Sequence, residues 1–354
     1  MTVPSGRRGE PRMTRAFADL PELSPANFAM VMATGIISIG LHQRGLAVPA
    51  LVLFGLNLAA WVMLWVLTVL RTLRSPRRLG ADLVDHLRGP GFFTMVAATA
   101  VLGSQFVLLI ASFRVAIAFL ALSGLLWVGL TYTIFAAFTI KEEKPTLDQG
   151  ISGSWLLAVV ATQSLAVLSA LIAAHFAQPL RLELNFFALS MWLWGGMLYI
   201  WMMSLIFYRY TFFHFSPGDL TPPYWINMGA MAISTLAGAT LIANAADAPF
   251  LHSLLPFLKG FTVFYWATGT WWIPMLLVLG VWRHGYKRFP LRYDPQYWGA
   301  VFPLGMYAVG TRAMAGVMKL GFVGWLPTLF QGIALVAWTA AFIGLLRRLI
   351  HYVR

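Results

Sequence analysis

The chain has 354 residues, of which 59% are hydrophobic and 10% are charged, and its formal net charge is +13. Soluble domains carry about 25% charged residues, so this composition indicates a polytopic membrane protein. The absence of cysteine excludes a disulfide framework and a thiolate metal site. The basic excess would fit nucleic-acid binding in a soluble chain, but the positive-inside rule accounts for it here, and no nucleic-acid partner is expected.

Residues 1–24 form a polar stretch that we interpret as a cytoplasmic N-terminal tail. Four arginines precede two acidic residues, at Arg7, Arg8, Arg12, Arg15, Asp19 and Glu22. No apolar core with a small-residue cleavage site follows the arginines, so the stretch differs from a signal peptide. Residues 25–350 are expected to form one transmembrane domain.

Ten apolar segments follow in this domain. They occupy residues 26–42, 48–71, 91–110, 114–139, 153–175, 184–208, 225–245, 254–281, 297–318 and 325–346. Each is long enough for a helix to cross about 30 Å of hydrocarbon. The loops between them are short, so the function has to lie in the bundle itself. The predicted fold class is an all-α integral membrane protein with ten transmembrane helices in five hairpins.

The distribution of Lys and Arg supports this count. The tails and every second loop together hold 19 basic residues, whereas each intervening loop holds a single one: Arg44, Arg114, Arg181, Lys259 and Lys319. This alternation runs through every loop, as the positive-inside rule requires. We therefore expect a multi-pass protein of the cytoplasmic membrane with both termini in the cytoplasm.

The apolar segments are almost free of charge. None of the 12 Asp and Glu residues falls inside one, and of the 25 Lys and Arg residues only Arg312 lies well within one. Cation and proton carriers usually keep an acid in the membrane, so the pattern favours a neutral or negatively charged solute. The histidines lie at or beyond segment ends, and no metal or acid–base cluster is expected in the spans. We expect no enzyme activity and no cofactor.

The remaining intramembrane polar groups have two interpretations. Hydroxyl and amide side chains such as Thr34, Asn227 and Thr311 either bond neighbouring helices or supply weak donors to small anions along a pore. Arg312 either extends outward to the membrane surface or forms an electropositive outer vestibule. Pro303 removes a backbone donor and is expected to kink its helix, with Gly305 two residues later.

Three stretches, in order, resemble the tellurite-resistance/dicarboxylate transporter family, which also contains the slow-type anion channels of plant guard cells. They are NFAMVMATG at 27–35, PYWINMGAMAI at 223–233 and YWGAVFPLGM at 297–306. From the residues alone, Phe302 reads as an ordinary packed or lipid-facing aromatic. The third stretch is similar to the family's ninth helix, where a phenylalanine is often followed by proline.

The resemblance implies a homotrimer in which each protomer has its own pore, lined by the odd-numbered helices and surrounded by the even-numbered ones. It also implies a pore gate at Phe302, because a phenylalanine at this position of the ninth helix occludes the pore. The residues expected at the pore or at its helix kink are Phe28, Thr34, Asn227, Gly229, Pro303, Gly305 and Thr311, with Arg312 attracting anions.

The expected function is passive or weakly coupled passage of small anions through a pore closed by Phe302. The alternative is a proton-coupled carrier or exporter of sulfite or C4-dicarboxylates. A dianion would require a second positive group facing Arg312, and no other basic residue lies deep in the spans. A third possibility, a non-transporting scaffold or sensor, has little docking surface in such short loops.

Overall fold

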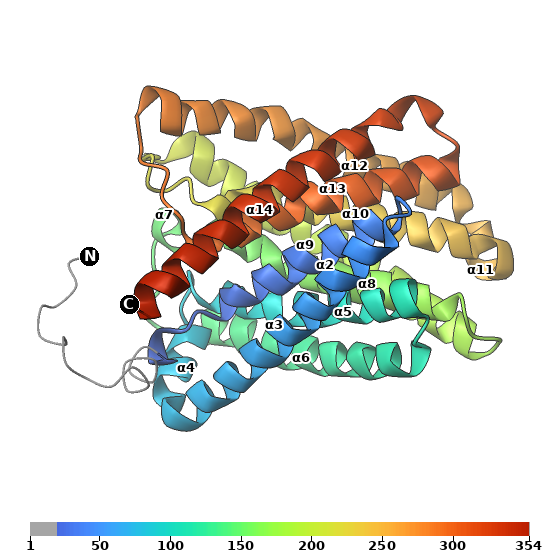
Figure 1. Ribbon diagram of the computed structural model, residues 1–354, viewed down its shortest axis with the longest axis horizontal. Coiled ribbons are helices and arrows are strands. Elements are labelled where there is room, and N and C mark those ends of the chain that lie inside the picture. The colour runs from blue at the N-terminus through green and yellow to red at the C-terminus, as the bar shows by residue number, and fades with distance from the viewer. Residues whose placement is uncertain (1–19, 354) are drawn as a thin grey trace, which may run out of the picture.

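The computed structural model describes residues 20–353, which form helices and no strand (Figure 1). Most of the expected N-terminal tail, residues 1–19, lies outside the described residues. All ten predicted segments coincide with long helices, although the ends differ by several residues. The helices at the sixth and tenth segments, for example, run longer than predicted, as α9 (Leu180–Phe212) and α14 (Trp325–Val353).

The all-α membrane architecture is confirmed. Nine helices of the described region are long and apolar enough to cross a membrane. The helix at the ninth segment, α13 (Trp298–Met318), is not among them, since Arg312, Tyr307 and several glycines lower its hydropathy. Its 21 residues are nonetheless sufficient in length for a span. The count of ten therefore remains a prediction that rests on α13.

Five helices form a closed inner ring. These inner helices are α2 (Ala29–His42), α5 (Phe93–Ile110), α8 (Leu157–Ala173), α10 (Ile226–Asn244) and α13. Each packs against two others, in the cyclic order α2, α5, α8, α10, α13 and back to α2. They are the first, third, fifth, seventh and ninth segments of the sequence.

The outer helices cover this ring. They are α3 (Ala47–Arg74), α6 (Phe113–Ile140), α9, α12 (Leu255–Val281) and α14. The burial of the apolar window separates the two sets: 94% of it is buried for the span of α8, against 11% for that of α6. The contrast places small-residue helices inside and Leu- and Trp-rich helices at the lipid boundary.

The two ends of the bundle differ. The short helices α4 (Pro76–Leu83) and α7 (Leu147–Gly150) lie at the end where α14 finishes, which we call the inner end (Figure 1). The short helix α11 (Pro249–Ser253) lies at the opposite, outer end (Figure 1). All inner helices start at the inner end. Ion pairs tie down two outer helices there: the buried pair of Arg71 with Asp82, and the partly buried pair of Arg209 with Asp219 at 3.3 Å.

A short 3-10 turn precedes every inner helix, and each turn begins with Pro or Gly. The turns are Pro25–Phe28, Gly89–Phe92, Gly153–Leu156, Pro222–Trp225 and Pro295–Tyr297. Proline suits such a position because its missing N–H would be unpaired at a helix start anyway. The five hairpins thus share a structural repeat that is too weak to recognise in the sequence.

Five tryptophans of the outer helices join neighbouring hairpins. Each indole N–H donates to an inner helix of the next hairpin: Trp61 to Thr99, Trp127 to Thr162, Trp192 to the carbonyl of Ser234, Trp266 to Thr311 and Trp338 to Thr34. The donor–acceptor distances are 2.8–3.1 Å. The last bond runs from α14 to α2 and closes the circle.

Glycine permits the close approach of α10 and α13. A Cβ atom at Gly310 would lie 2.6 Å from the carbonyl oxygen of Ala232, and one at Gly229 would lie 2.6 Å from Cγ of Pro303. Small residues at such crossings let two backbones pack directly.

Gly310→Ala is therefore expected to lower the unfolding free energy by about 1–3 kcal/mol, because the clash is with backbone and forces the helices apart. Gly316→Ala on the same helix is the matched control, since a Cβ atom at this position would have no neighbour within 4 Å among the described residues. Thermal unfolding of the detergent-purified variants, followed by tryptophan fluorescence, measures the difference. Equal melting temperatures for the two variants would show that α10 and α13 are not in this close contact.

Candidate functional site

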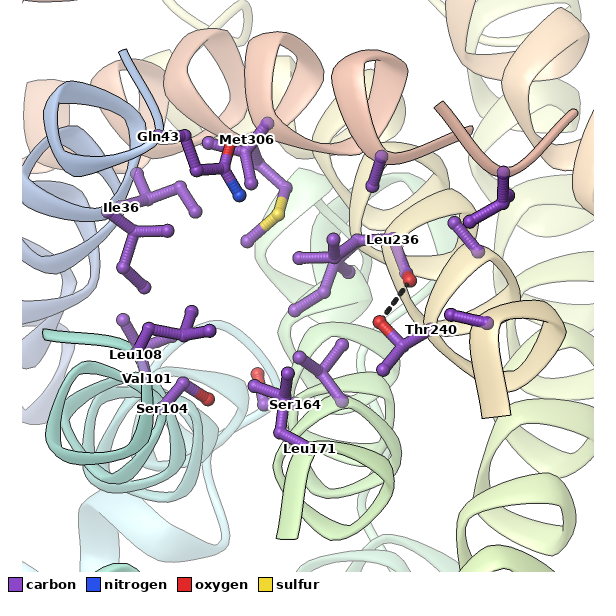
Figure 2. Close-up of a pocket in the computed structure, with 18 residues that line it drawn as sticks. Ile36, Gln43, Val101, Ser104, Leu108, Ser164, Leu171, Leu236, Thr240 and Met306 are labelled. Atoms are coloured by element: carbon purple, nitrogen blue, oxygen red, sulfur yellow. Dashed lines mark hydrogen bonds between the residues drawn. The ribbon is translucent and has the colours of Figure 1, made fainter. Parts of the chain in front are cut away.

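The inner ring encloses a cavity of about 240 Å³, which we call the axial cavity (Figure 2). All five inner helices line it with residues three or four positions apart. On α13 these are Met306, Val309, Ala313 and Val317. On every inner helix the lining begins near the middle and continues toward the outer end, so the cavity occupies the outer half of the ring.

The lining of the axial cavity is mostly aliphatic, and its hydroxyl groups are already bonded. Ser104, Ser164 and Thr240 each donate to the carbonyl four residues earlier in their own helix, at 3.0, 2.7 and 2.9 Å. Gln43 differs, because no hydrogen bond engages its side-chain amide within the described residues. Figure 2 shows its nitrogen turned toward the cavity. Gln43 is thus the lining residue with a free N–H donor.

The ring is closed at the inner end of the axial cavity. Residues on one face of a helix recur every three or four positions. One turn before the cavity, the faces that line it therefore present Met32, Ala97, Val160, Gly229 and Phe302, all of them buried. Phe302 precedes Met306 by one turn, carries the only aromatic ring of this layer and is 1% exposed. No acidic side chain occurs in this layer or in the cavity lining.

Two predicted site residues, Pro303 and Gly305, lie beside this closed layer, which itself contains Phe302 and Gly229. Pro303 packs against Gly229 of α10, as described above. Gly305 faces α2, since a Cβ there would lie 2.9 Å from Cγ2 of Ile36. The structure therefore brings Phe302, Pro303, Gly229 and Gly305 together.

The other predicted pore residues are turned toward the outer helices. The hydroxyls of Thr34 and Thr311 accept the indole bonds from α14 and α12. The Phe28 ring lies 5.7 Å from that of Trp65 on α3, measured between centroids. The Asn227 amide donates to the Tyr210 hydroxyl on α9 at 3.0 Å. In these contacts the hydroxyl and amide groups bond neighbouring helices, which is the first of the two interpretations given in the sequence analysis.

Arg312 is exposed near the outer end, where it lines a small pocket of about 10 Å³. Gln43 and Arg44, at the end of α2, line the same pocket, as does Gln331 of α14. Sequence reasoning treated Arg44 only as a loop charge and did not single out Gln43. No local pattern relates residue 44 to residue 312, so only the fold reveals their proximity.

Residues 22–346 match the voltage-dependent anion channel family. The chain belongs to this family. The match confirms the resemblance drawn from the three sequence stretches, and it means that anion transport across a membrane is the activity that the family supports. Nearly the whole described bundle falls within the matched range, including the inner ring and the axial cavity.

Named relatives agree with this assignment. An uncharacterized membrane protein of Mycobacterium tuberculosis is 41% identical over 158 residues, which cover 43% of this chain and 77% of the relative. Two proteins of Methanocaldococcus jannaschii, both named uncharacterized transporters, are each 25% identical to this chain. The alignments cover 84% of this chain and 86% of one relative, and 89% of this chain and 92% of the other.

The boundary between open cavity and closed layer is testable with single cysteines, since the chain has none of its own. Ser104→Cys lines the axial cavity, whereas Ala97→Cys lies in the closed layer of the same helix. A water-soluble thiol reagent should modify the first about ten times faster or more, because a buried apolar site excludes the reagent. Mass spectrometry of the detergent-purified variants reads out the rates. Similar rates would place the closure elsewhere.

Proposed function

We propose that this protein conducts small anions across the cytoplasmic membrane along the axis of the inner ring, and that Phe302 is the gate. The observation that carries the proposal is the buried aromatic ring one turn below an axial cavity that all five inner helices line. Pro303, Gly229 and Gly305 surround the gate and hold α13 close to its two neighbours.

The electrostatics of the path support an anion as the solute. The cavity lining contains no carboxylate that would repel an anion. All five inner helices begin at the inner end, and helix N-termini carry a partial positive charge of about half an elementary charge. Arg312 and Arg44 lie at the other end. The helix N-termini therefore favour negative charge at the inner mouth, and at the outer mouth the two arginines offset the partial negative charge of the helix C-termini. Between the mouths, an anion would bind weakly enough to be released.

The closed layer is apolar as well as narrow. Met32, Val160 and Phe302 present hydrocarbon to the axis, and such constrictions block ions by excluding the water that accompanies them. Rotation of the Phe302 side chain would remove the largest group of the layer. The axial cavity one turn away offers the space into which the ring turns.

A proton-coupled carrier of sulfite or C4-dicarboxylates is the second candidate. The observation in its favour is that Arg44 lines the same small pocket as Arg312. Arg44 would supply the second positive group that a dianion needs. Against it stands the lack of a titratable side chain among the residues that line the axial cavity.

The membrane arrangement belongs to the same proposal. Residues 25–350 act as one transporting domain, with the inner end and both termini in the cytoplasm. Assembly into homotrimers is proposed from the family resemblance, with one conduction path in each protomer. The large apolar side chains exposed on α3, α6, α12 and α14 would then face lipid or a neighbouring protomer.

Phe302→Ala is expected to raise nitrate and chloride flux at least about tenfold, the change produced by lowering a barrier by about 1.4 kcal/mol. The measurement is flux from proteoliposomes that hold the purified variant. Phe264→Ala is the control, because this ring lies on an outer helix and is 46% exposed. Unchanged flux in a folded, inserted Phe302→Ala protein would exclude the gate.

The same liposomes separate the two candidates. A channel predicts flux that follows the electrical gradient and does not saturate. Saturable flux of sulfite or succinate that depends on a pH gradient, and that is lost in Phe302→Ala, would favour the carrier.

A further inference from the structure

Two arginines from distant parts of the sequence meet at the outer end of the ring. Arg44 follows α2, Arg312 lies on α13, and both line the small pocket described above. Both side chains are exposed. Between residues 20 and 353, none of the ion pairs involves either arginine. Two guanidinium groups thus share a site without a carboxylate to balance them.

Gln43 connects this pocket to the axial cavity. It lines both spaces, and so does Val309 of α13. Figure 2 shows the Gln43 nitrogen turned toward the cavity, and the amide has no partner among the described residues. The other glutamine of the pocket, Gln331, is committed to the bundle, because its Nε2 donates to the carbonyl of Ile37 at 3.4 Å. On the path from the outer end into the cavity, the two arginines Arg44 and Arg312, unpaired within the described residues, are therefore followed by the unbonded amide of Gln43.

The chemistry of these three groups selects a class of ligand. Guanidinium presents N–H donors in a planar fork that matches oxyanions such as nitrate, sulfite or a carboxylate. The pocket volume of about 10 Å³ corresponds to one water-sized group. One oxygen of an oxyanion would fill it, while the rest of the ion remains in the open mouth, within reach of the exposed arginines.

We propose that Arg44, Arg312 and Gln43 form a binding site for a small oxyanion at the outer mouth of the axial cavity. The arginines capture the ion, and the Gln43 amide passes it into the cavity. This inference rests on the proposed function, since it names the class of anion and the residues that receive it. Charge concentrates the anion at the mouth, so the contribution of the site is largest at low anion concentration and low ionic strength.

Anion binding to the purified protein tests the site without requiring transport. Isothermal titration with nitrate in a low-salt detergent buffer is the measurement, with chloride as the monatomic comparison. Arg44→Gln/Arg312→Gln is expected to weaken nitrate binding about tenfold or more, since it removes two charge-assisted donors. Arg114→Gln is the control, because it removes an exposed arginine at the same end of the bundle that lines neither space.

Two further variants examine the roles of the groups. Arg312→Lys keeps the charge and loses the fork, so it should weaken nitrate binding more than chloride binding. Gln43→Leu should weaken nitrate binding about threefold, less than the double arginine variant does, because a neutral donor contributes less than a charge-assisted one. In the Phe302→Ala background it should lower nitrate flux at low concentration several-fold.

The inference is overturned if the wild type binds no nitrate, or if the double arginine variant binds nitrate as tightly as Arg114→Gln does. It is also overturned if Arg312→Lys weakens nitrate binding and chloride binding equally. The proposed function has a separate readout. Nitrate binding that depends on the two arginines, together with a Phe302→Ala protein that passes no anion, would leave the site in place and reject the conduction path.

Discussion

The ring of inner helices depends on hydrogen bonds that the outer helices supply from behind. In hydrocarbon, an indole N–H without an acceptor is costly, and each of the five tryptophans has found one on the next hairpin. Four of the acceptors are threonine hydroxyls of the ring. Because the bonds run in one sense around the molecule and the last returns to α2, the ring has no free edge.

These same bonds decide what the cavity can offer a solute. Thr34 and Thr311 are occupied by indoles, and Ser104 and Ser164 donate to their own helices. A ring of polar side chains thereby encloses an almost apolar space. Attraction for an anion has to come from the two ends, where helix N-termini meet at one side and Arg44 and Arg312 at the other.

The sequence was sufficient for the all-α membrane architecture and for the family. The absence of charge marked the spans, and the alternation of arginine in the loops indicated five hairpins. It also pointed to the Phe302 region, because Pro303 and the neighbouring glycines form a recognisable stretch. The sequence could not predict that the side chains of Thr34, Thr311 and Asn227 face the outer helices. Their indole or phenol partners lie on other helices and leave no local sequence pattern. The proximity of Arg44 to Arg312 was hidden for the same reason, since two charges so far apart in the sequence meet only once the ring closes.

The axial cavity and the closed layer differ most in the room that they leave for the hydration shell of an ion. At a liquid share of about 30 Å³ per molecule, a space of about 240 Å³ has room for about eight waters. On the proposed path, an anion in the axial cavity would therefore keep much of its hydration and bind loosely among aliphatic walls. The layer of Met32, Ala97, Val160, Gly229 and Phe302 is buried and carries no side-chain donor. On the proposed path, dehydration would be required only at Phe302, so the ease with which an anion sheds water would govern its passage at that level. The proposed oxyanion site at Arg44 and Arg312 would sort ions by a different property, the geometry of their oxygens, so that two filters would act in series along one path.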